Sequence, residues 1–416
     1  MEARPLKNKI VVTAVSPFTP LGNSVEDIAR NLENCKCGFQ YVSRFNTEFF
    51  EVKHAGEVDA SDLDSIQYPY DGSLQFKMFY YCMEKLFESL KHNYKSERIG
   101  CIIGADPNIG AMEDYEKSFI DFYQNSDKEG KDEKENLMKI DPSMLGYYVA
   151  KDFGINGPFV YNLGTCAAST QAIGTGYYML QDNTADMMIV GGVSSKIDPL
   201  SFARLSRLGA LEKTHEDLNN NCCPFDKKRS GFTIAEGCVL FALEREEDAL
   251  KRNANILAEV KGYGAAIDSY SMTNPHKDAL GMRLAMERAL EDANVDPAEV
   301  DYINAHGTGT AVNDVYETKA IKDVFHESAK SVSISSTKSM HGHLITATGA
   351  MEMLCCMLAI RDSKIAPTIH HTELDPECDL DYTFNEMKEK EVNITLNNTF
   401  GLGGQNASLI ISKYEK

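Results

Sequence analysis

Apolar runs alternate with amphipathic stretches along the chain. The apolar runs predict strands at residues 9–16, 98–106, 185–195, 237–246, 256–268, 300–310 and 331–336, and a hairpin at 392–414. Most are apolar at nearly every position, which is typical of strands covered on both faces. Helices are predicted between them, at residues 23–32, 143–154, 280–294 and 344–363. This alternation predicts an α/β fold with a buried sheet.

The order of elements in the first part of the chain recurs in the second part. We therefore predict two domains, residues 1–252 and residues 253–416. The likeness lies in element order and not in sequence identity, so it only suggests a duplicated fold. The stretch 344–363 is mostly apolar, which predicts a central, buried helix.

Composition narrows the class of protein. The formal net charge of -20 disfavours nucleic acid and anionic membranes as partners. No apolar run is long enough for a transmembrane helix, and the N-terminus runs straight into a strand pattern without a leader. Eleven cysteines in 416 residues are too few for a disulfide scaffold, and none has C-x-x-C spacing. These features predict a cytoplasmic protein with reduced thiols, and the charged stretch 124–136 is predicted to be a solvated loop.

Cys166 lies in the segment NLGTCAASTQAIGTG, residues 162–176. A strand-like stretch leads to it, and small residues after it open a helix. A cysteine at a helix N-terminus is stabilised as thiolate by unpaired N–H groups, so the pKa of Cys166 is expected to be lowered. The alternative is a cysteine packed in the core.

Two further segments carry histidines. His306 stands in NAHGTGT (304–310), where a structural histidine is as reasonable as a catalytic one. Lys338, His341 and His343 lie together in SSTKSMHGHL (335–344). Burying a lysine is costly, so a buried lysine is expected to be paired with another group or to take part in the chemistry. The three histidines also suggest a metal site, but the motif has no carboxylate beside it, so acid–base chemistry is favoured.

The fourth segment, NNTFGLGGQN (397–406), is a glycine-rich turn that frees backbone N–H groups to meet a ligand, or is a plain hairpin turn. In this order, the four segments resemble the β-ketoacyl-acyl carrier protein synthases, closest to the elongating type II group of the thiolase-like condensing enzymes. Further matching segments are TPLGNSVED (19–27), PFDKKRSGFTIAEG (224–237), MTNP (272–275), HGTGTAVND (306–314), STKSMHGHLITATGAME (336–352), APTIH (366–370) and DPECDLDY (375–382).

The resemblance implies a thiolase-like fold, with two similar halves in alternating αβαβα layers. It implies an acyltransferase that condenses a cysteine-bound acyl chain with malonyl-acyl carrier protein, losing carbon dioxide. No cofactor is expected beyond the carrier's phosphopantetheine arm. The implied catalytic residues are Cys166 as nucleophile, His306 and His343 as donors to the malonyl carbonyl, and Lys338 and Glu352 as residues that organise them.

The same resemblance implies further positions around that site. The backbone N–H groups of Cys166 and Leu402 would form an oxyanion hole. A structural monovalent cation would lie near Asn304, Glu352 and Asn397, and the gate and acyl pocket would include Phe400, Leu402, Ile109 and Phe202. His341 matches no family histidine and is expected to be a loop side chain that perturbs His343.

The chain departs from the family at places that bear on substrate and partner. Leu402 replaces a gating phenylalanine, Gln405 follows the glycines, and the stretch near residue 65 lacks basic residues for the acidic carrier. Alternative contacts for the carrier are Arg204, Arg207, Lys227 and Lys228, or a partner subunit. Family members dimerise through the N-terminal half.

These departures leave two pathways open. One is fatty acid elongation by a homodimer. The other is the catalytic subunit of a type II polyketide or polyene synthase, paired with a cysteine-lacking chain-length factor. A non-catalytic scaffold is disfavoured because the cysteine and both histidines are kept. A thiolase is disfavoured because the glycine-rich turn has no second cysteine.

Overall fold

The computed structural model describes residues 8–68, 73–106 and 143–415. Ile109 and the stretch 124–136 lie outside these residues. Within them, no helix is long and apolar enough to cross a membrane. All eleven cysteines are free.

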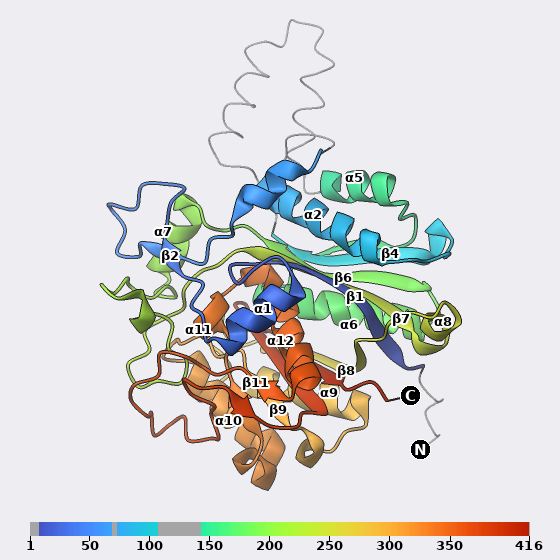
Figure 1. Cartoon of the computed structure of the whole chain (residues 1–416). Coiled ribbons are helices and arrows are strands. Elements are labelled where there is room, and N and C mark those ends of the chain that lie inside the picture. Colours follow the sequence, from blue (N-terminus) through green and yellow to red (C-terminus); the bar gives the residue numbers. More distant parts are fainter. Residues whose placement is uncertain (1–7, 69–72, 107–142, 416) are drawn as a thin grey trace, which may run out of the picture.

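A large mixed sheet organises the molecule (Figure 1). Its first five strands lie in the order β5-β4-β6-β7-β1 and its other five in the order β10-β9-β13-β14-β8. The first group is β1 (Ile10–Phe18), β4 (Ile99–Ala105), β5 (Phe159–Asn162), β6 (Met187–Ser194) and β7 (Gly237–Arg245). The second group is β8 (Ala258–Ile267), β9 (Tyr302–Asn304), β10 (Ser333–Ser335), β13 (Ile394–Gly401) and β14 (Gln405–Ser412).

The two groups of strands have the same internal pairing. In the first, β1 and β6 both run antiparallel to β7, and β6, β4 and β5 are parallel. In the second, β8 and β13 both run antiparallel to β14, and β13, β9 and β10 are parallel. In the described part of the chain, the two groups of strands are joined by one short antiparallel pairing, between Ile10–Val12 of β1 and Ala258–Val260 of β8. The repeat of element order is thus a repeat of topology.

Helices complete the layers seen in Figure 1. Helices α6 (Ala168–Gln181) and α12 (Thr348–Asp362) lie between the two groups of strands. Helices α2 (Leu74–Ser89) and α5 (Ser143–Phe153) cover the outer face of the first group, and α9 (Leu280–Ala293) and α10 (Asn313–Phe325) cover the second. The predicted α/β fold with αβαβα layers is confirmed.

Smaller elements lie around these layers. They are α1 (Val25–Glu33), α7 (Pro199–Arg207), α8 (Glu246–Lys251), α11 (Lys338–His341) and the short pairs β2 (Gln40–Tyr41) with β3 (His54–Ala55) and β11 (Lys364–Ile365) with β12 (Lys388–Glu389). Helix α1 begins as its sequence predicts, because Ser24 accepts a hydrogen bond from the Asp27 N–H at 3.1 Å.

Helix α12 is buried as its apolar sequence predicts, with every residue from Thr348 to Ile360 inside the protein. It begins at Thr348 and not at residue 344, because Ile345 has a left-handed φ of 46° that opens a short 3₁₀ turn, Ile345–Ala347. Helix α6 begins in the same way, after the 3₁₀ turn Thr165–Ala167, and Thr165 has a φ of 51°. Both central helices therefore start at a tight elbow.

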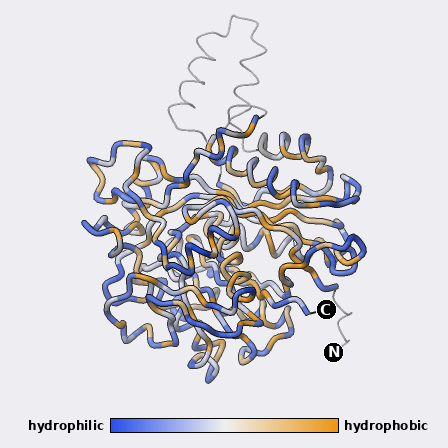
Figure 2. Tube along the Cα trace, in the orientation of Figure 1, coloured by the Kyte–Doolittle hydropathy of each residue, from blue (hydrophilic) through white to orange (hydrophobic). Residues whose placement is uncertain are grey.

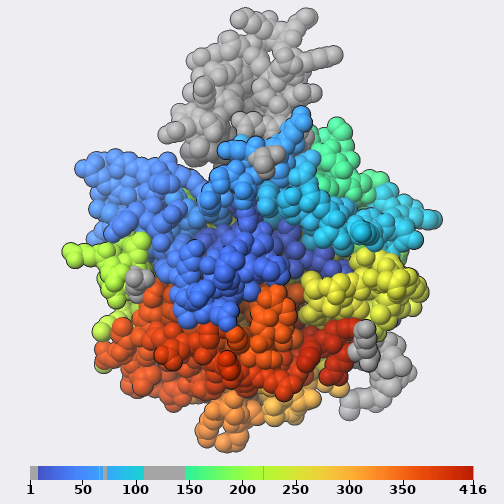
Figure 3. Space-filling view, viewed as in Figure 1, coloured from blue at the N-terminus to red at the C-terminus, as the bar shows by residue number. Residues whose placement is uncertain are grey.

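Apolar residues follow the strands and central helices, and polar residues collect on the outer loops and helices (Figure 2). In the space-filling view, the N-terminal residues form the upper part and the C-terminal residues the lower part (Figure 3). The two elbows lie where these parts meet, because both central helices begin there.

Candidate active site

The elbow before α6 carries Cys166, whose side chain is buried. The preceding strand is very close: a Cβ added to Gly104 of β4 would lie 2.5 Å from the Ser169 nitrogen. Only glycine allows β4 to approach the helix start this closely. The elbow thus holds the thiol just before the first residue of α6, inside the junction of the two parts.

The glycine-rich turn between β13 and β14 lies against this elbow. Thr165 Oγ1 donates to the Leu402 carbonyl oxygen at 3.1 Å, and a Cβ on Gly401 would lie 2.3 Å from Thr165 Oγ1. The Leu402 N–H bonds the Cys166 thiol and lowers its pKa. The turn therefore brings a backbone donor to the sulfur.

His306 lies two residues after β9, which ends at Asn304 and not at residue 310 as predicted. Its Nδ1 lies 3.2 Å from Lys338 Nζ. An ammonium group only donates, so Nδ1 accepts and the neutral ring carries its proton on Nε2. Burial and the charge of Lys338 lower the pKa of His306 well below its usual value, so the ring is neutral.

His343 is held in the same tautomer by a different donor. Its Nδ1 accepts the Ile345 N–H at 3.0 Å. Burial, with the charge of Lys338, lowers its pKa as well. Its ring lies 5.4 Å from that of His306, nearly perpendicular at 86°. The site thus has two neutral imidazoles whose Nε2–H groups are left to donate.

Cys166 Sγ and one nitrogen of each of these histidines lie within 4.8 Å of one another. Such a cluster has the composition of a zinc site. A metal at Nε2 would require the proton to move to Nδ1, where the Ile345 N–H and the Lys338 ammonium already donate. The hydrogen bonds therefore favour Nε2–H donors over a metal at these atoms.

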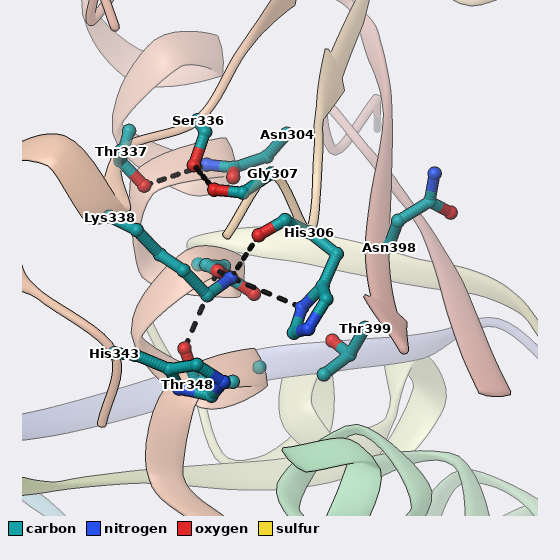
Figure 4. Close-up of polar contacts among 12 residues, drawn as sticks. Asn304, His306, Gly307, Ser336, Thr337, Lys338, His343, Thr348, Asn398 and Thr399 are labelled. Atoms are coloured by element: carbon teal, nitrogen blue, oxygen red, sulfur yellow. Dashed lines mark hydrogen bonds and ion pairs between the residues drawn. The ribbon is translucent and has the colours of Figure 1, made fainter. Parts of the chain in front are cut away.

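Lys338 has all three of its N–H bonds engaged. They reach the His306 carbonyl oxygen at 2.6 Å, His306 Nδ1, and Glu352 Oε1 (Figure 4). Neither Lys338 nor Glu352 has exposed side-chain surface. Burial raises the pKa of Glu352 to about 7, although the Lys338 charge acts to lower it. Lys338 thus fixes the position of His306 through both its ring and its carbonyl oxygen.

The expected lowering of the pKa of Cys166 is wrong for this structure. Burial is the largest influence and raises the thiol pKa to about 11, while the charge of Lys338 and the Leu402 N–H act in the opposite direction. Desolvation of a thiolate in this enclosed position outweighs the opposing effects of the Lys338 charge and the Leu402 N–H. The resting thiol is therefore protonated at neutral pH.

Glu317 and Asp314 of α10 hold the loop after β9, and the sequence did not single them out. Glu317 accepts the N–H groups of His306 and Gly307, each at 2.8 Å, and burial raises its pKa to about 7. Asp314 accepts the Gly309 N–H at 3.2 Å. Two acidic residues three positions apart in a helix after a glycine-rich loop are the signal that could have identified them.

His341 is not a loop side chain as expected. It ends the single turn of α11 and is completely buried, with Nδ1 2.7 Å from the Gly342 carbonyl oxygen and Nε2 2.9 Å from Thr337 Oγ1. Burial lowers its pKa to about 3. Both nitrogens are used by the fold, so His341 is a structural histidine.

Three of the four residues expected at the gate and acyl pocket, Phe400, Leu402 and Phe202, lie at or near the site. The Phe400 ring is 5.9 Å from that of His306, and Leu402 is partly exposed. Phe202 is fully buried in an apolar cluster with Phe232, whose ring lies 4.7 Å from His343. Ile109 lies outside the described residues.

Three buried oxygens near Lys338 have no hydrogen-bond partner among the described residues: Asn304 Oδ1, Glu352 Oε2 and Asn397 Oδ1. The two amides are fixed by their nitrogens, which donate to Thr337 Oγ1 at 3.2 Å and to the Gly349 carbonyl oxygen at 2.9 Å. Oxygen donors without protons suit a hard cation. These are the residues expected near a monovalent cation, and they fit one.

A buried cysteine at an elbow, a backbone donor at its sulfur and two neutral imidazole donors define a condensing acyltransferase. Comparison with known proteins agrees. Residues 7–249 match the family described as beta-ketoacyl synthase, N-terminal domain, and residues 257–372 match its C-terminal domain. The chain belongs to the β-ketoacyl synthase family.

Individual relatives cover almost the whole chain. A 3-oxoacyl-[acyl-carrier-protein] synthase 2 of Staphylococcus aureus is 36% identical over 414 residues, covering 98% of this chain and 99% of the relative. One from Synechocystis is 34% identical over 427 residues, with the same coverage.

Solved structures agree in fold. The ishigamide ketosynthase/chain length factor is 30% identical, with a TM-score of 0.87, covering 99% of this chain and 100% of that one. A type II polyketide ketosynthase, bound to a hexaketide and solved with its acyl-carrier protein, is 29% identical, with a TM-score of 0.86, covering 98% and 100%. The fold is thiolase-like.

Proposed function

We propose that this protein is a β-ketoacyl-acyl carrier protein synthase that extends an acyl chain by two carbons through decarboxylative condensation. The observation that carries the proposal is the meeting of Cys166 Sγ with two histidines that are both held neutral as Nε2–H donors. The names of the relatives, which are 3-oxoacyl-[acyl-carrier-protein] synthases, support the substrate class.

The first half-reaction transfers the acyl chain. Cys166 Sγ attacks the carrier's thioester carbonyl, the bond to the carrier sulfur breaks, and the carrier thiol leaves with the proton that Cys166 gives up. The developing oxyanion accepts the N–H groups of Cys166 and Leu402. Because the resting thiol is protonated, this transfer depends on the arriving pantetheine sulfur as the final proton acceptor.

The second half-reaction makes the new carbon–carbon bond. The malonyl thioester carbonyl accepts the Nε2–H groups of His306 and His343. The bond to the carboxylate breaks, carbon dioxide leaves, and its electron pair forms an enolate at that carbonyl. The enolate carbon attacks the acyl carbon, and the Cys166 sulfur leaves and regains a proton. The electrons balance without a redox or group-carrying cofactor.

The halves of the chain divide this work. Residues 1–252 supply the nucleophile, and residues 253–416 supply both histidines, Lys338 and Glu352. A monovalent cation held by Asn304, Glu352 and Asn397 would neutralise the carboxylate oxygen that Lys338 does not reach. Phe400, Leu402, Phe202 and Ile109 are proposed to shape the gate and acyl pocket.

The partner is proposed to be an acyl carrier protein in the cytoplasm. Its acidic surface would meet Arg204 and Arg207, which lie exposed in the last turn of α7. Lys227 is a weaker choice, since it is already paired with Glu373 at 2.5 Å. A second subunit would pair along β5, an edge strand with exposed apolar residues at Val160 and, just beyond it, Leu163.

Fatty acid elongation and polyketide synthesis both remain candidates for the pathway. The Staphylococcus and Synechocystis relatives favour the first. The structural neighbours, a type II polyketide ketosynthase and a ketosynthase/chain length factor, favour the second, in which the partner is a cysteine-lacking homologue.

The test is the intact mass of the purified chain after mixing with acyl-carrier proteins of several chain lengths. An acyl adduct that is absent from Cys166→Ala would establish the nucleophile. Malonyl-carrier protein added next should release carbon dioxide and a product two carbons longer. An adduct that forms only after co-expression with a chain-length factor supports the polyketide reading. No adduct in either preparation contradicts the proposed function.

A further inference from the structure

A partly buried carboxylate, that of Asp106, lies close to the start of α6. Asp106 directly follows β4, and β4 packs through Gly104 onto the start of α6. Its partner Thr346 belongs to the second elbow, three residues after His343. The Asp106 charge acts to raise the pKa of Cys166, which agrees with a position close to the sulfur.

Hydrogen bonds fix one oxygen of this carboxylate. Asp106 Oδ2 accepts the Ser194 hydroxyl at 3.0 Å and the Thr346 hydroxyl at 3.2 Å. Thr346 and Ser194 are themselves buried, and Ser194 ends β6. The carboxylate is therefore placed by two strands and an elbow, and not by a flexible surface loop.

The other carboxylate oxygen, Asp106 Oδ1, is available to accept a hydrogen bond from a ligand. Asp106 Oδ1 has no hydrogen bond within the described part of the chain, and its nearest cation is Lys196 Nζ at 3.9 Å. That distance gives charge attraction but no hydrogen bond. Among the described residues, Lys196 has this one charged partner, and the two side chains are 25% and 15% exposed. An acceptor and a donor thus stand side by side, mostly desolvated but reachable.

A hydrocarbon chain beside this pair would remove water from both groups while they stay 3.9 Å apart, too far for a hydrogen bond to each other, which is unfavourable. A hydroxyl group on the chain would donate to Asp106 Oδ1, and a keto or hydroxyl oxygen would accept from Lys196 Nζ. Hydrogen bonds to charged groups are the stronger kind. The pair therefore matches an acyl chain that carries oxygen.

We propose that Asp106 and Lys196 form a specificity subsite for oxygen-bearing acyl chains, hydroxyacyl or ketoacyl, held on Cys166. This inference rests on the proposed function, since it concerns the acyl group that the condensation uses. Ser194 and Thr346 are positioning residues for Asp106. The subsite accepts one hydroxyl or keto group and disfavours a fully saturated chain of the same length.

The experiment compares acylation rates of Cys166 by pantetheine thioesters of one length: octanoyl and its 3-, 5- and 7-hydroxy derivatives. Intact mass against time gives kcat/KM for each. The wild-type chain should prefer at least one hydroxy derivative over octanoyl by about tenfold, the size expected for a hydrogen bond to a charged group. Lys196→Met and Asp106→Leu should each reduce this ratio to about twofold or less.

The Lys196→Met variant is expected to fold normally, because Lys196 is partly exposed and contacts no other charged group among the described residues. It therefore keeps the test valid if Asp106→Leu does not fold. Lys213→Met, which removes a surface ion pair with Glu51, is the matched control and should leave the ratio unchanged. Equal rates for all four thioesters in the wild-type chain would overturn the subsite while leaving the condensing function intact. So would a loss of rate in Lys196→Met that is equal for every thioester. Failure of every thioester to load would overturn the proposed function itself.

Discussion

At the scale of single residues, the site depends on charges that water does not reach. Lys338 and Glu352 are completely buried, and each is the other's charged partner. A buried pair adds little net stability, but removing one partner leaves an uncompensated charge. The pair is therefore best explained by its effect on His306: Lys338 orients Nδ1, and this leaves the proton on Nε2, the atom proposed to donate to the substrate.

Lys338→Met is expected to lower the free energy of unfolding by about 3–5 kcal/mol and to reduce condensation, because Glu352 then lacks its cation. The double variant Lys338→Met, Glu352→Leu should recover most of that stability while condensation stays low. Denaturant unfolding and carbon dioxide release measure the two effects. Recovery of activity together with stability would show that the pair serves only the fold.

Glu317 should make stability depend on pH. Its pKa is raised from an ordinary 4.5 to about 7 by burial, so the folded chain holds this proton more tightly than the unfolded chain. Stability from this group is full below about pH 4.5 and is lost as pH rises to about 7, by about 3 kcal/mol. Glu317→Gln cannot ionise, so wild-type stability relative to this variant should fall over that range. A difference that is constant, or that grows with pH, contradicts the assignment.

At the scale of elements, the glycine-rich turn and the Cys166 elbow form one unit. Thr165 bonds the Leu402 carbonyl oxygen, and the Gly404 N–H donates to the Gly401 carbonyl oxygen at 3.1 Å, which closes the turn. The spacing leaves no volume between Gly401 and the elbow. The position of the Leu402 N–H thus depends on contact between two segments far apart in sequence.

Gly401→Ala should displace the turn, because the new Cβ would lie 2.3 Å from Thr165 Oγ1 and 3.2 Å from the Cys166 nitrogen. Loss of one oxyanion donor lowers acyl transfer by about 100-fold or more. Gly403→Ala is the control in the same turn: its Cβ meets open space, and its φ of 82° costs only about 1–2 kcal/mol. Single-turnover loading of Cys166 compares them. Equal loading by both variants would place the oxyanion donor elsewhere.

Most of the elements were predictable from the sequence, and so were the side chains that the structure brings together in the candidate site. Long apolar runs gave the strands and α12, and the motifs gave Cys166, His306, Lys338 and His343. The elbow at Ile345 was not predictable from the sequence. A residue with a left-handed φ before a helix has no clear sequence signal when that residue is isoleucine. Glu317 and Asp106 were missed because their partners lie on other elements and meet them only after folding. The protonation of Cys166 was misjudged because burial is a property of the whole junction.

At the scale of the whole molecule, the two groups of strands meet along three residue pairs, and β5 is the edge strand of the first group in the described part of the chain. Val160 on that edge is 38% exposed, and Leu163 after it is 62% exposed. An exposed apolar edge strand is a place for another chain to pair.

Val160→Asp should convert a dimer to a monomer, because a charge on each edge would be buried unpaired against the other copy. Leu250→Asp, on an exposed position of α8 at 48%, is the control and should leave the dimer intact. Light scattering after size exclusion gives the mass. A Val160→Asp chain that remains dimeric places the interface elsewhere.

The elbow occurs twice in the molecule, so the residues of one copy can be compared with those of the other. Residues 165–167 and 345–347 have the same shape, and each begins with a left-handed residue and ends with an alanine before a central helix. The left-handed first residue and the final alanine, which the two elbows share, are required by the shape of the backbone. The middle residue, cysteine in one elbow and threonine in the other, differs because only the first elbow carries the proposed nucleophile. At the position in the second elbow that corresponds to Cys166, Thr346 uses its hydroxyl to hold the Asp106 carboxylate in place, so one backbone shape serves a nucleophile in one half and a positioning residue in the other.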